Sequence, residues 1–195
     1  MQLKRVFSLA EARGTKNYID TQKKYEISRT LLYFAISISL FVAGVIQTGE
    51  RANILSIIAI LGCLPASKSA VSAVMFLRFK SCSAHAAEEI ERHSAGLHCL
   101  YDMVFTSYKK NYCVSHLAVC GNTICGYAEY DPQFDENAFY AHIGNILNMD
   151  GHKDVTVKIF KNLQKYTERL EQMKALEAEP ARSQAVIGTL KSVAL

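Results

Sequence analysis

Five side chains that could bind a metal or do thiol chemistry flank the dipeptide Gly121-Asn122. A glycine at the first position of a two-residue loop favours a type II′ β-hairpin, in which Cys120 faces Thr123. Because side chains alternate between the two faces of a strand, one face of this hairpin gathers an imidazole, two thiols, a phenol and a carboxylate. These residues are His116, Cys120, Cys125, Tyr127 and Glu129. Imidazoles and thiolates bind Zn²⁺, and accessible thiolates are nucleophiles, so this face is the candidate site.

Three interpretations of this face are open: a metal site, a reactive thiol, and packing beneath a helix. The Cys-x4-Cys spacing is not that of a zinc knuckle, and a fourth ligand must come from elsewhere. Cysteine is also among the most buried residue types, so packing is the interpretation that we favour. The sequence contains no Gly-rich phosphate loop, GxSxG, HExxH or CxxC. We therefore expect no cofactor and no bound metal, and we assign no catalytic residue.

The hairpin belongs to an expected soluble α+β domain over residues 84–178, with the order α-β-β-β-α-β-α. Asp135 can cap the middle helix, which Gly151 ends. The predicted helices cover residues 84–100, 135–149 and 162–178, and the predicted strands cover residues 101–106, 113–120, 123–130 and 155–160. Apolar residues between Leu163 and Leu176 form a seam on the last helix, which we expect to contact a partner unless the sheet covers it. Residues 179–195 form a further helix or a tail.

Over residues 84–160 this element order is similar to the core of the restriction-endonuclease-like superfamily. That resemblance implies a metal-binding Asp on the second strand and Glu-x-Lys on the third. Here the second strand, CVSHLAVC, contains no acid, and the third ends in Glu129-Tyr130-Asp131 without a lysine. The resemblance therefore implies at most a nuclease-like fold that lacks its catalytic motif, and no residue is carried across.

Two hydrophobic segments lie before this domain, within residues 31–79. The first covers residues 31–47 and the second residues 53–77, joined by a turn at residues 48–52. The first has no charged residue and is about the minimum length for a helix that spans a bilayer. The sequence predicts a transmembrane helical hairpin, so the lipid bilayer is an expected partner.

Positive charge is concentrated beside these segments. The net charge is +4 over residues 1–30, +3 over residues 31–84 and −3 over residues 85–195. A mildly acidic domain argues against nucleic acid as a partner. Basic residues on both outer flanks, with only Arg51 in the turn, place both termini in the cytoplasm, and we expect a multi-pass protein of a bacterial plasma membrane. Residues 1–30 are then a basic cytoplasmic segment.

Three basic residues are expected at the membrane interface: Lys68, Arg78 and Lys80. If the two helices mirror about the turn, Lys68 lies level with Tyr33, near enough to the edge for its ammonium to reach water. The alternative is a buried functional lysine.

Small residues recur every four positions in both segments, and we expect them to form the helix contact or an oligomer seam. The two stripes are Ala35, Ser39 and Ala43 in the first helix, and Gly62, Ala66 and Ala70 in the second, with Ala73 one turn further on.

The function predicted from these features is a membrane-anchored cytoplasmic interaction or regulatory module without catalytic activity, which binds another protein or itself. One alternative is an enzyme with a thiol or metal site on the hairpin face of His116, Cys120 and Cys125. Another is a small oligomeric transport component with Lys68 on its path.

Overall fold

The chain forms two compact units in a computed structural model that describes residues 13–108, 110–176 and 179–195. One unit is a helical hairpin, Ile19–Lys80. The other comprises the described residues up to Tyr18 together with Ser81–Leu195. Residues 1–12 of the basic N-terminal segment, residue 109 and the predicted end of the helix at residues 177–178 lie outside the described residues.

The hairpin consists of α3 (Tyr18–Thr48) and α4 (Ile54–Leu77). Two long apolar helices were predicted here, and both are present. The α3 helix begins at Tyr18 rather than at Leu31, because no Gly or Pro interrupts the intervening residues. The Asn53 side chain caps α4 by accepting a hydrogen bond from the Ser56 amide.

The contact between the two helices differs in part from the predicted stripes. On α4, Ala66 and Ala73 of the predicted stripe are buried and Gly62 and Ala70 are half-buried, and the buried Ala59 was not predicted. On α3 the prediction of a helix contact was wrong, since the stripe of Ala35, Ser39 and Ala43 is exposed and Ser37 and Gly44 are buried instead. The alternative, that this stripe is an oligomer seam, stays a prediction. A helix has 3.6 residues per turn, so steps of four drift around it by about 40° each, whereas a seam alternates steps of three and four.

A polar cluster joins the helices near the open end of the hairpin. Arg29 donates to the Glu26 carboxylate at 2.6 Å and to the Ser69 hydroxyl at 3.1 Å, and Thr30 donates to Ser69 at 2.9 Å. This pairing places the exposed Lys68 level with Leu31, two residues further toward the open end than the mirrored position at Tyr33. The turn is therefore not symmetric about its centre.

The second unit has the predicted element order, followed by one more helix. Its elements are α5 (Ala84–His93), β1 (His98–Thr106), β2 (Asn111–Cys120), β3 (Thr123–Tyr127), α6 (Glu136–Met149), β4 (Thr156–Phe160), α7 (Leu163–Lys174) and α8 (Pro180–Val193). Asp135 caps α6 as predicted. The first helix is shorter than predicted: it ends at His93 because Gly96 adopts a left-handed conformation (φ +85°), and β1 starts at His98.

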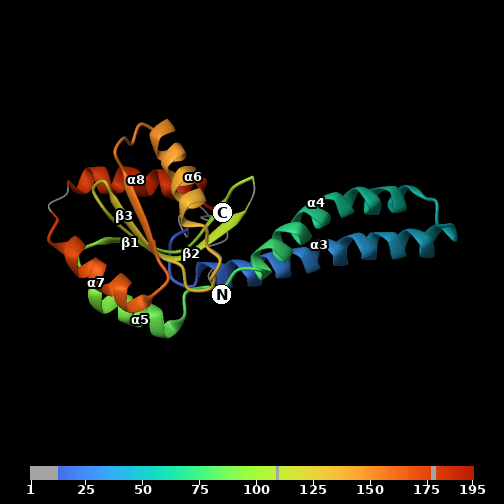
Figure 1. The fold of residues 1–195 in the computed structure, drawn as a ribbon. Helices are drawn as coiled ribbons and strands as arrows, with labels where there is room; N and C mark the ends of the chain where they lie inside the picture. Colours follow the sequence, from blue (N-terminus) through green and yellow to red (C-terminus); the bar gives the residue numbers. More distant parts are fainter. Residues whose placement is uncertain (1–12, 109, 177–178) are drawn as a thin grey trace. The chain divides into compact units, whose positions relative to one another are not determined.

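The sheet has the strand order β1-β2-β3-β4, with β3 and β4 parallel and the other neighbours antiparallel. Helices cover both faces (Figure 1). One core lies beneath α6 and α8, which contribute Phe139, Ile143 and Leu190. The other lies beneath α5 and α7, which contribute Ile90, Tyr166 and Leu170. The sheet therefore uses the seam on α7, which is the exception that the expectation of a partner contact allowed.

Both edges of the sheet are closed by other parts of the unit. On β1, the Tyr101 amide donates to the Gly14 carbonyl, and the Leu195 amide donates to the Val104 carbonyl. On β4, the Ile159 amide donates to the Tyr140 hydroxyl at 3.0 Å. Pairing of a further strand at either edge is hindered by these contacts.

Candidate functional site

The β2–β3 hairpin has the predicted register. His116 pairs with Tyr127, Ala118 with Cys125, and Cys120 with Thr123. Leu117, Val119 and Ile124 lie in the core beneath α6 and α8, so the candidate residues occupy the face toward α5 and α7.

His116 is fully buried, and its nearest polar partner comes from α7. Its Nδ1 atom lies 2.5 Å from the Tyr166 hydroxyl oxygen, which is also 3.4 Å from the Cys125 carbonyl. With a proton on Nδ1, the imidazole donates to Tyr166 and Tyr166 donates to Cys125. Among the described residues, the Nε2 atom then keeps a lone pair without a partner, which costs less than an unpaired N–H.

Burial makes His116 a neutral residue at physiological pH. The low-dielectric surroundings disfavour the imidazolium and lower the pKa of His116 to about 3. The rings of Tyr101 and Tyr166 both meet the imidazole edge-on, with centroids at 4.5 and 5.7 Å. A base with this pKa, enclosed by aromatic rings, is poorly suited to accept a proton from a substrate.

Cys125 and Tyr127 lie in the same layer. Burial raises the pKa of the Cys125 thiol and raises the pKa of Tyr127 to about 12. The Tyr127 ring stacks on Tyr166 at 5.6 Å. Both groups therefore remain protonated at neutral pH, and the thiol is not in the nucleophilic form.

Cys120 and Glu129 lie away from this cluster. The Cys120 thiol donates to the carbonyls of Met173 and Leu176, at 3.7 Å each, where α7 ends. The Glu129 carboxylate accepts from the Ser83 amide at 2.9 Å. The five residues thus share a face of the hairpin but do not form one cluster: His116, Cys125 and Tyr127 lie together, and Cys120 and Glu129 each lie apart from them. In the part of the chain that the structure describes, no three His, Cys, Asp or Glu side chains are arranged to hold a metal ion.

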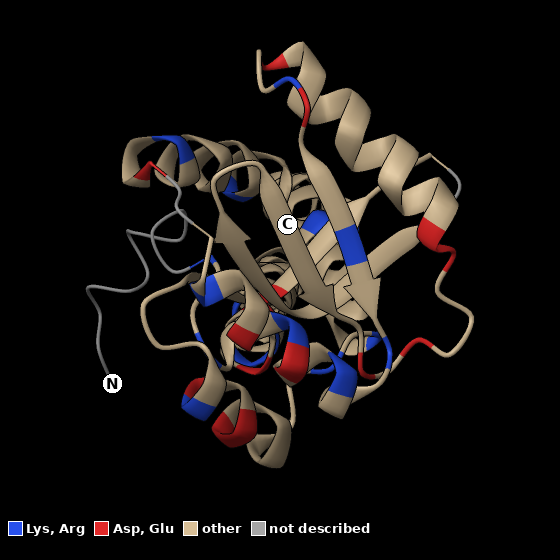
Figure 2. Cartoon of the chain, turned by 60° about the vertical axis from the view of Figure 1, so that its left-hand side comes forward, with Lys and Arg blue, Asp and Glu red and all other residues tan. Residues whose placement is uncertain are grey.

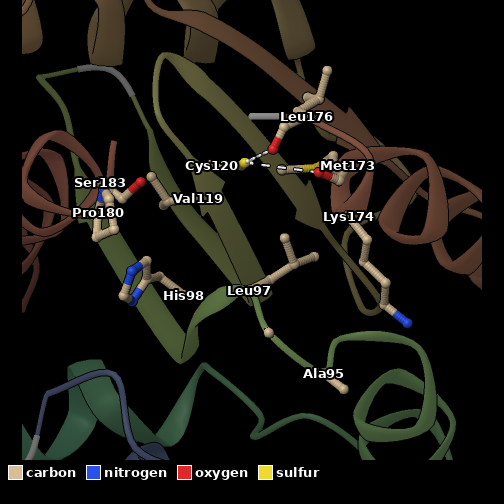
Figure 3. Close-up of a pocket in the computed structure, with 11 residues that line it drawn as sticks. Ala95, Leu97, His98, Val119, Cys120, Met173, Lys174, Leu176, Pro180 and Ser183 are labelled. Carbon is tan, nitrogen blue, oxygen red and sulfur yellow. Dashed lines mark hydrogen bonds between the residues drawn. The ribbon is translucent and has the colours of Figure 1, made fainter. Parts of the chain in front are cut away.

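A cavity of about 180 Å³ lies beside Cys120, between the start of β1, the end of β2, the end of α7 and the start of α8. His98 and Cys120 lie on different walls, and Lys174 extends away from Cys120 (Figure 3). Lys174 is instead paired with Glu171 at 2.9 Å. The cavity does not reach His116, Cys125, Tyr127 or Glu129, so it does not join the candidate residues into one site.

Two polar residues that matter to the structure were missed in the sequence. Tyr166 was assigned only to an apolar seam, because it lies fifty residues from His116 and the sequence gives no local signal of their contact. Asp102 was assigned only to a strand, but it is 1% exposed and its carboxylate accepts from the Cys82 amide at 2.8 Å.

Acidic and basic residues are interspersed on the helices and loops in Figure 2, and the strands carry few of them. The strands β2 and β3 contain no Asp or Glu. The acids that the nuclease resemblance would require on the second and third strands are therefore missing from the sheet itself.

Comparison of the chain with protein-family models, with curated proteins and with solved structures finds no match in any of the three.

Proposed function

We propose that the chain is a membrane-anchored module, in which α3 and α4 cross a bilayer and the α/β unit acts in the cytoplasm as an interaction or regulatory domain without catalytic activity. The observation that carries this proposal is the apolar outer surface of the hairpin. Both helices are long and apolar enough to cross a membrane.

Large apolar side chains project outward around both helices. Leu31, Ile46 and Ile54 are 66%, 78% and 76% exposed, and many neighbours are similarly exposed. Contact of this surface with water costs about 25 cal/mol per Å², whereas hydrocarbon removes the cost. The seam between the helices meanwhile contains small and polar residues, such as Ser37, Gly44 and Ala66, as is common where helices pack in lipid.

The distribution of charge supports the orientation. The short turn contains Arg51 as its only basic residue, and Lys or Arg residues flank both helices on the opposite side. By the positive-inside rule the α/β unit faces the cytoplasm. The exposed Lys68, which lies level with the start of the apolar stretch of α3, suits a snorkelling side chain better than a transport path.

The α/β unit supports a role in interaction rather than in catalysis. Its candidate thiols and imidazole are committed to packing and internal hydrogen bonds, and the acids near them bind backbone amides. We expect its partner to be another protein or a second copy of this chain.

Alkaline carbonate extraction of membranes that contain the full-length protein tests the anchoring. We expect the protein to stay in the pellet. Ile38→Asp places a charge near the middle of the apolar stretch, at a cost of about 3 kcal/mol for insertion, and should move protein into the soluble fraction. Met149→Asp, at an exposed position of the α/β unit, is the matched control and should have no effect. Wild-type protein in the soluble fraction would contradict the proposal.

The orientation is tested by a reporter that is active only after export. Fused after Leu195 it should be inactive, and inserted after Gly49 in the turn it should be active. The reverse pattern would place the α/β unit outside the cytoplasm.

A further inference from the structure

A hollow of about 560 Å³ lies at the turn end of the helical hairpin, against the first turns of α4. It belongs wholly to the hairpin, since every residue that lines it lies between Arg51 and Ile60. The lining combines one basic side chain with apolar ones such as Ile54 and Ile57. A cation beside an apolar wall suits an amphipathic molecule better than a free ion.

Arg51 supplies the positive charge of this hollow. Arg51 is exposed and forms no ion pair with any residue that the structure describes. A guanidinium presents a planar fork of N–H donors that fits two oxygens of a phosphate group. The preceding residue, Glu50, is also exposed, so the turn as a whole has no net charge. Opposite charges on neighbouring residues match a headgroup that carries one phosphate and one amine.

The N-terminus of α4 adds hydrogen-bond donors at the same place. The Asn53 side chain accepts from the Ser56 amide at 2.8 Å, whereas the amides of Ile54 and Leu55 have no partner within the helix. Ser56 lines the hollow and is only 5% exposed, and its hydroxyl oxygen has no hydrogen-bond partner in the described part of the chain. This end of the hairpin is therefore short of acceptors, which phosphate oxygens supply at helix N-termini.

An apolar stripe continues from the hollow along α4. Ile54, Ile57, Leu61 and Leu64 are each more than half exposed, and their spacing of three and four residues places them on one side of the helix. At 1.5 Å per residue, the ten steps from Ile54 to Leu64 cover about 15 Å, half of a hydrocarbon core of about 30 Å. The stripe thus has the depth of one leaflet, which is the length over which an acyl chain can lie.

We propose that this hollow binds one zwitterionic phospholipid of the leaflet in which the turn lies. Its phosphate contacts Arg51 and the N-terminus of α4, and one acyl chain follows the stripe from Ile54 to Leu64. The inference rests on the proposed function, because a hairpin that crosses the bilayer brings the turn to the level of the headgroups. It deepens that function by giving the anchor a site for one class of lipid.

Native mass spectrometry of the full-length protein, released from detergent micelles that contain dioleoylphosphatidylethanolamine, counts the lipid molecules that the protein retains. We expect one tightly retained lipid on the wild type. Arg51→Gln removes the guanidinium and should raise the lipid concentration needed for half-occupancy by about tenfold, as expected for the loss of a charge-assisted hydrogen bond. Arg78→Gln, which removes an exposed basic residue beyond the other end of α4, is the matched control and should bind the lipid as the wild type does.

A second variant tests the hollow without changing its charge. Ala52 is exposed and lines the hollow, so the indole of Ala52→Trp fills the space and should also weaken lipid retention, by a factor similar to that of Arg51→Gln. Tryptophan is favoured at the membrane interface, so insertion of the hairpin should be preserved. Gln47→Trp, at an exposed position of α3 near the same turn, is the matched control and should retain the lipid.

Two competitors identify which part of the lipid is recognised. Inorganic phosphate in excess should leave the lipid bound, because it has no acyl chain for the stripe. Dioleoylphosphatidylglycerol, which has the same chains and no amine, should bind more weakly than the phosphatidylethanolamine. The proposal is overturned if inorganic phosphate displaces the lipid, if phosphatidylglycerol binds more tightly, or if either Arg51→Gln or Ala52→Trp retains the lipid as the wild type does.

Carbonate extraction separates the failure of this inference from a failure of anchoring. Arg51→Gln and Ala52→Trp leave both apolar helices intact and should stay in the pellet. Wild-type protein that stays in the pellet but binds the lipid no better than Arg51→Gln is anchored and has no lipid site at the turn. Wild-type protein in the soluble fraction contradicts the anchoring itself.

Discussion

The Nδ1 atom of His116 on β2 lies 2.5 Å from the hydroxyl oxygen of Tyr166 on α7, and this contact is the polar centre of an otherwise apolar layer. A buried polar group that loses its partner costs more than the hydrogen bond itself contributes. The contact therefore favours the orientation in which α7 turns Tyr166 toward the sheet. A variant that removes it tests the interpretation that the candidate residues serve packing.

Tyr166→Phe should destabilise the α/β unit by about 1–3 kcal/mol, because it leaves His116 Nδ1 and the Cys125 carbonyl without the hydroxyl. Tyr108→Phe removes a hydroxyl from a fully exposed ring and should change stability by less than about 0.5 kcal/mol. Urea unfolding of the full-length protein in detergent, followed by circular dichroism, measures both. Equal midpoints for the two variants would show that the buried contact does not contribute to stability.

Stability should fall as the solution is acidified below the usual histidine pKa. His116 has a folded-state pKa of about 3 against 6.5 when exposed, so between these values the unfolded chain binds a proton that the folded chain does not. Stability from this group is fully present above pH 6.5 and is lost as the pH falls toward 3, by about 4–5 kcal/mol in total.

His116→Phe serves as the control, because it removes the titrating group and keeps an aromatic ring. The pH dependence of the unfolding midpoint between pH 6.5 and 4 should be steeper in the wild type than in this variant. Parallel curves would mean that His116 does not titrate differently on folding, and that the acid sensitivity comes from carboxylates alone.

The parts of the fold that follow from local chemistry were predictable from the sequence. Gly121-Asn122 determines a two-residue loop, and the loop determines every pairing from Cys120 back to His116. Asp135 and Asn53 cap their helices for the same local reason. In contrast, the helix end at His93 was misplaced, because Leu97, Cys99 and Leu100 continue a plausible helical pattern and the sequence does not show that Gly96 is left-handed.

The contacts that depend on tertiary packing were not predictable from one sequence. Nothing in the neighbourhood of Tyr166 indicates that it meets His116, and nothing near Asp102 indicates that it binds the amide of Cys82. The stripe of Ala35, Ser39 and Ala43 failed as the contact between the two helices, because spacing alone does not say which face of a helix the neighbouring helix occupies.

The thiols of the candidate face should be dispensable for folding. Cys120→Ala combined with Cys125→Ala should cost about 1–2 kcal/mol of stability, as small truncations in a core do. Elemental analysis of the purified wild-type protein should show no stoichiometric zinc or iron. About one equivalent of either metal, absent from the double variant together with much of its fold, would establish a structural metal site.

Gly126 on β3 should not accept a side chain. A Cβ atom there would lie 2.6 Å from Ile159 Cδ1 and 2.8 Å from Leu117 Cδ2, so Gly126→Ala should destabilise the unit by about 1–3 kcal/mol through overpacking. Gly144→Ala meets nothing within 4 Å on α6 and should stabilise it by up to about 1 kcal/mol, because alanine is the better helix former. Opposite signs in the urea midpoint support this packing, and a neutral Gly126→Ala contradicts it.

The packing of α3 on α4 can be tested by a disulfide. A Cβ atom at Gly62 would lie 3.8 Å from the Cβ atom of Ser37, which is the mean separation in disulfides. Ser37→Cys with Gly62→Cys, in a background with Cys63→Ala, should therefore oxidise within one chain, with the loss of two hydrogens seen by mass spectrometry of the joined peptides. The pair Ser39→Cys with Gly62→Cys should stay reduced within the chain, because Ser39 lies on the exposed side of α3. If this control pair forms the intramolecular disulfide and the first pair does not, the stripe of Ala35, Ser39 and Ala43 is the seam after all, and the register of the hairpin described here is wrong.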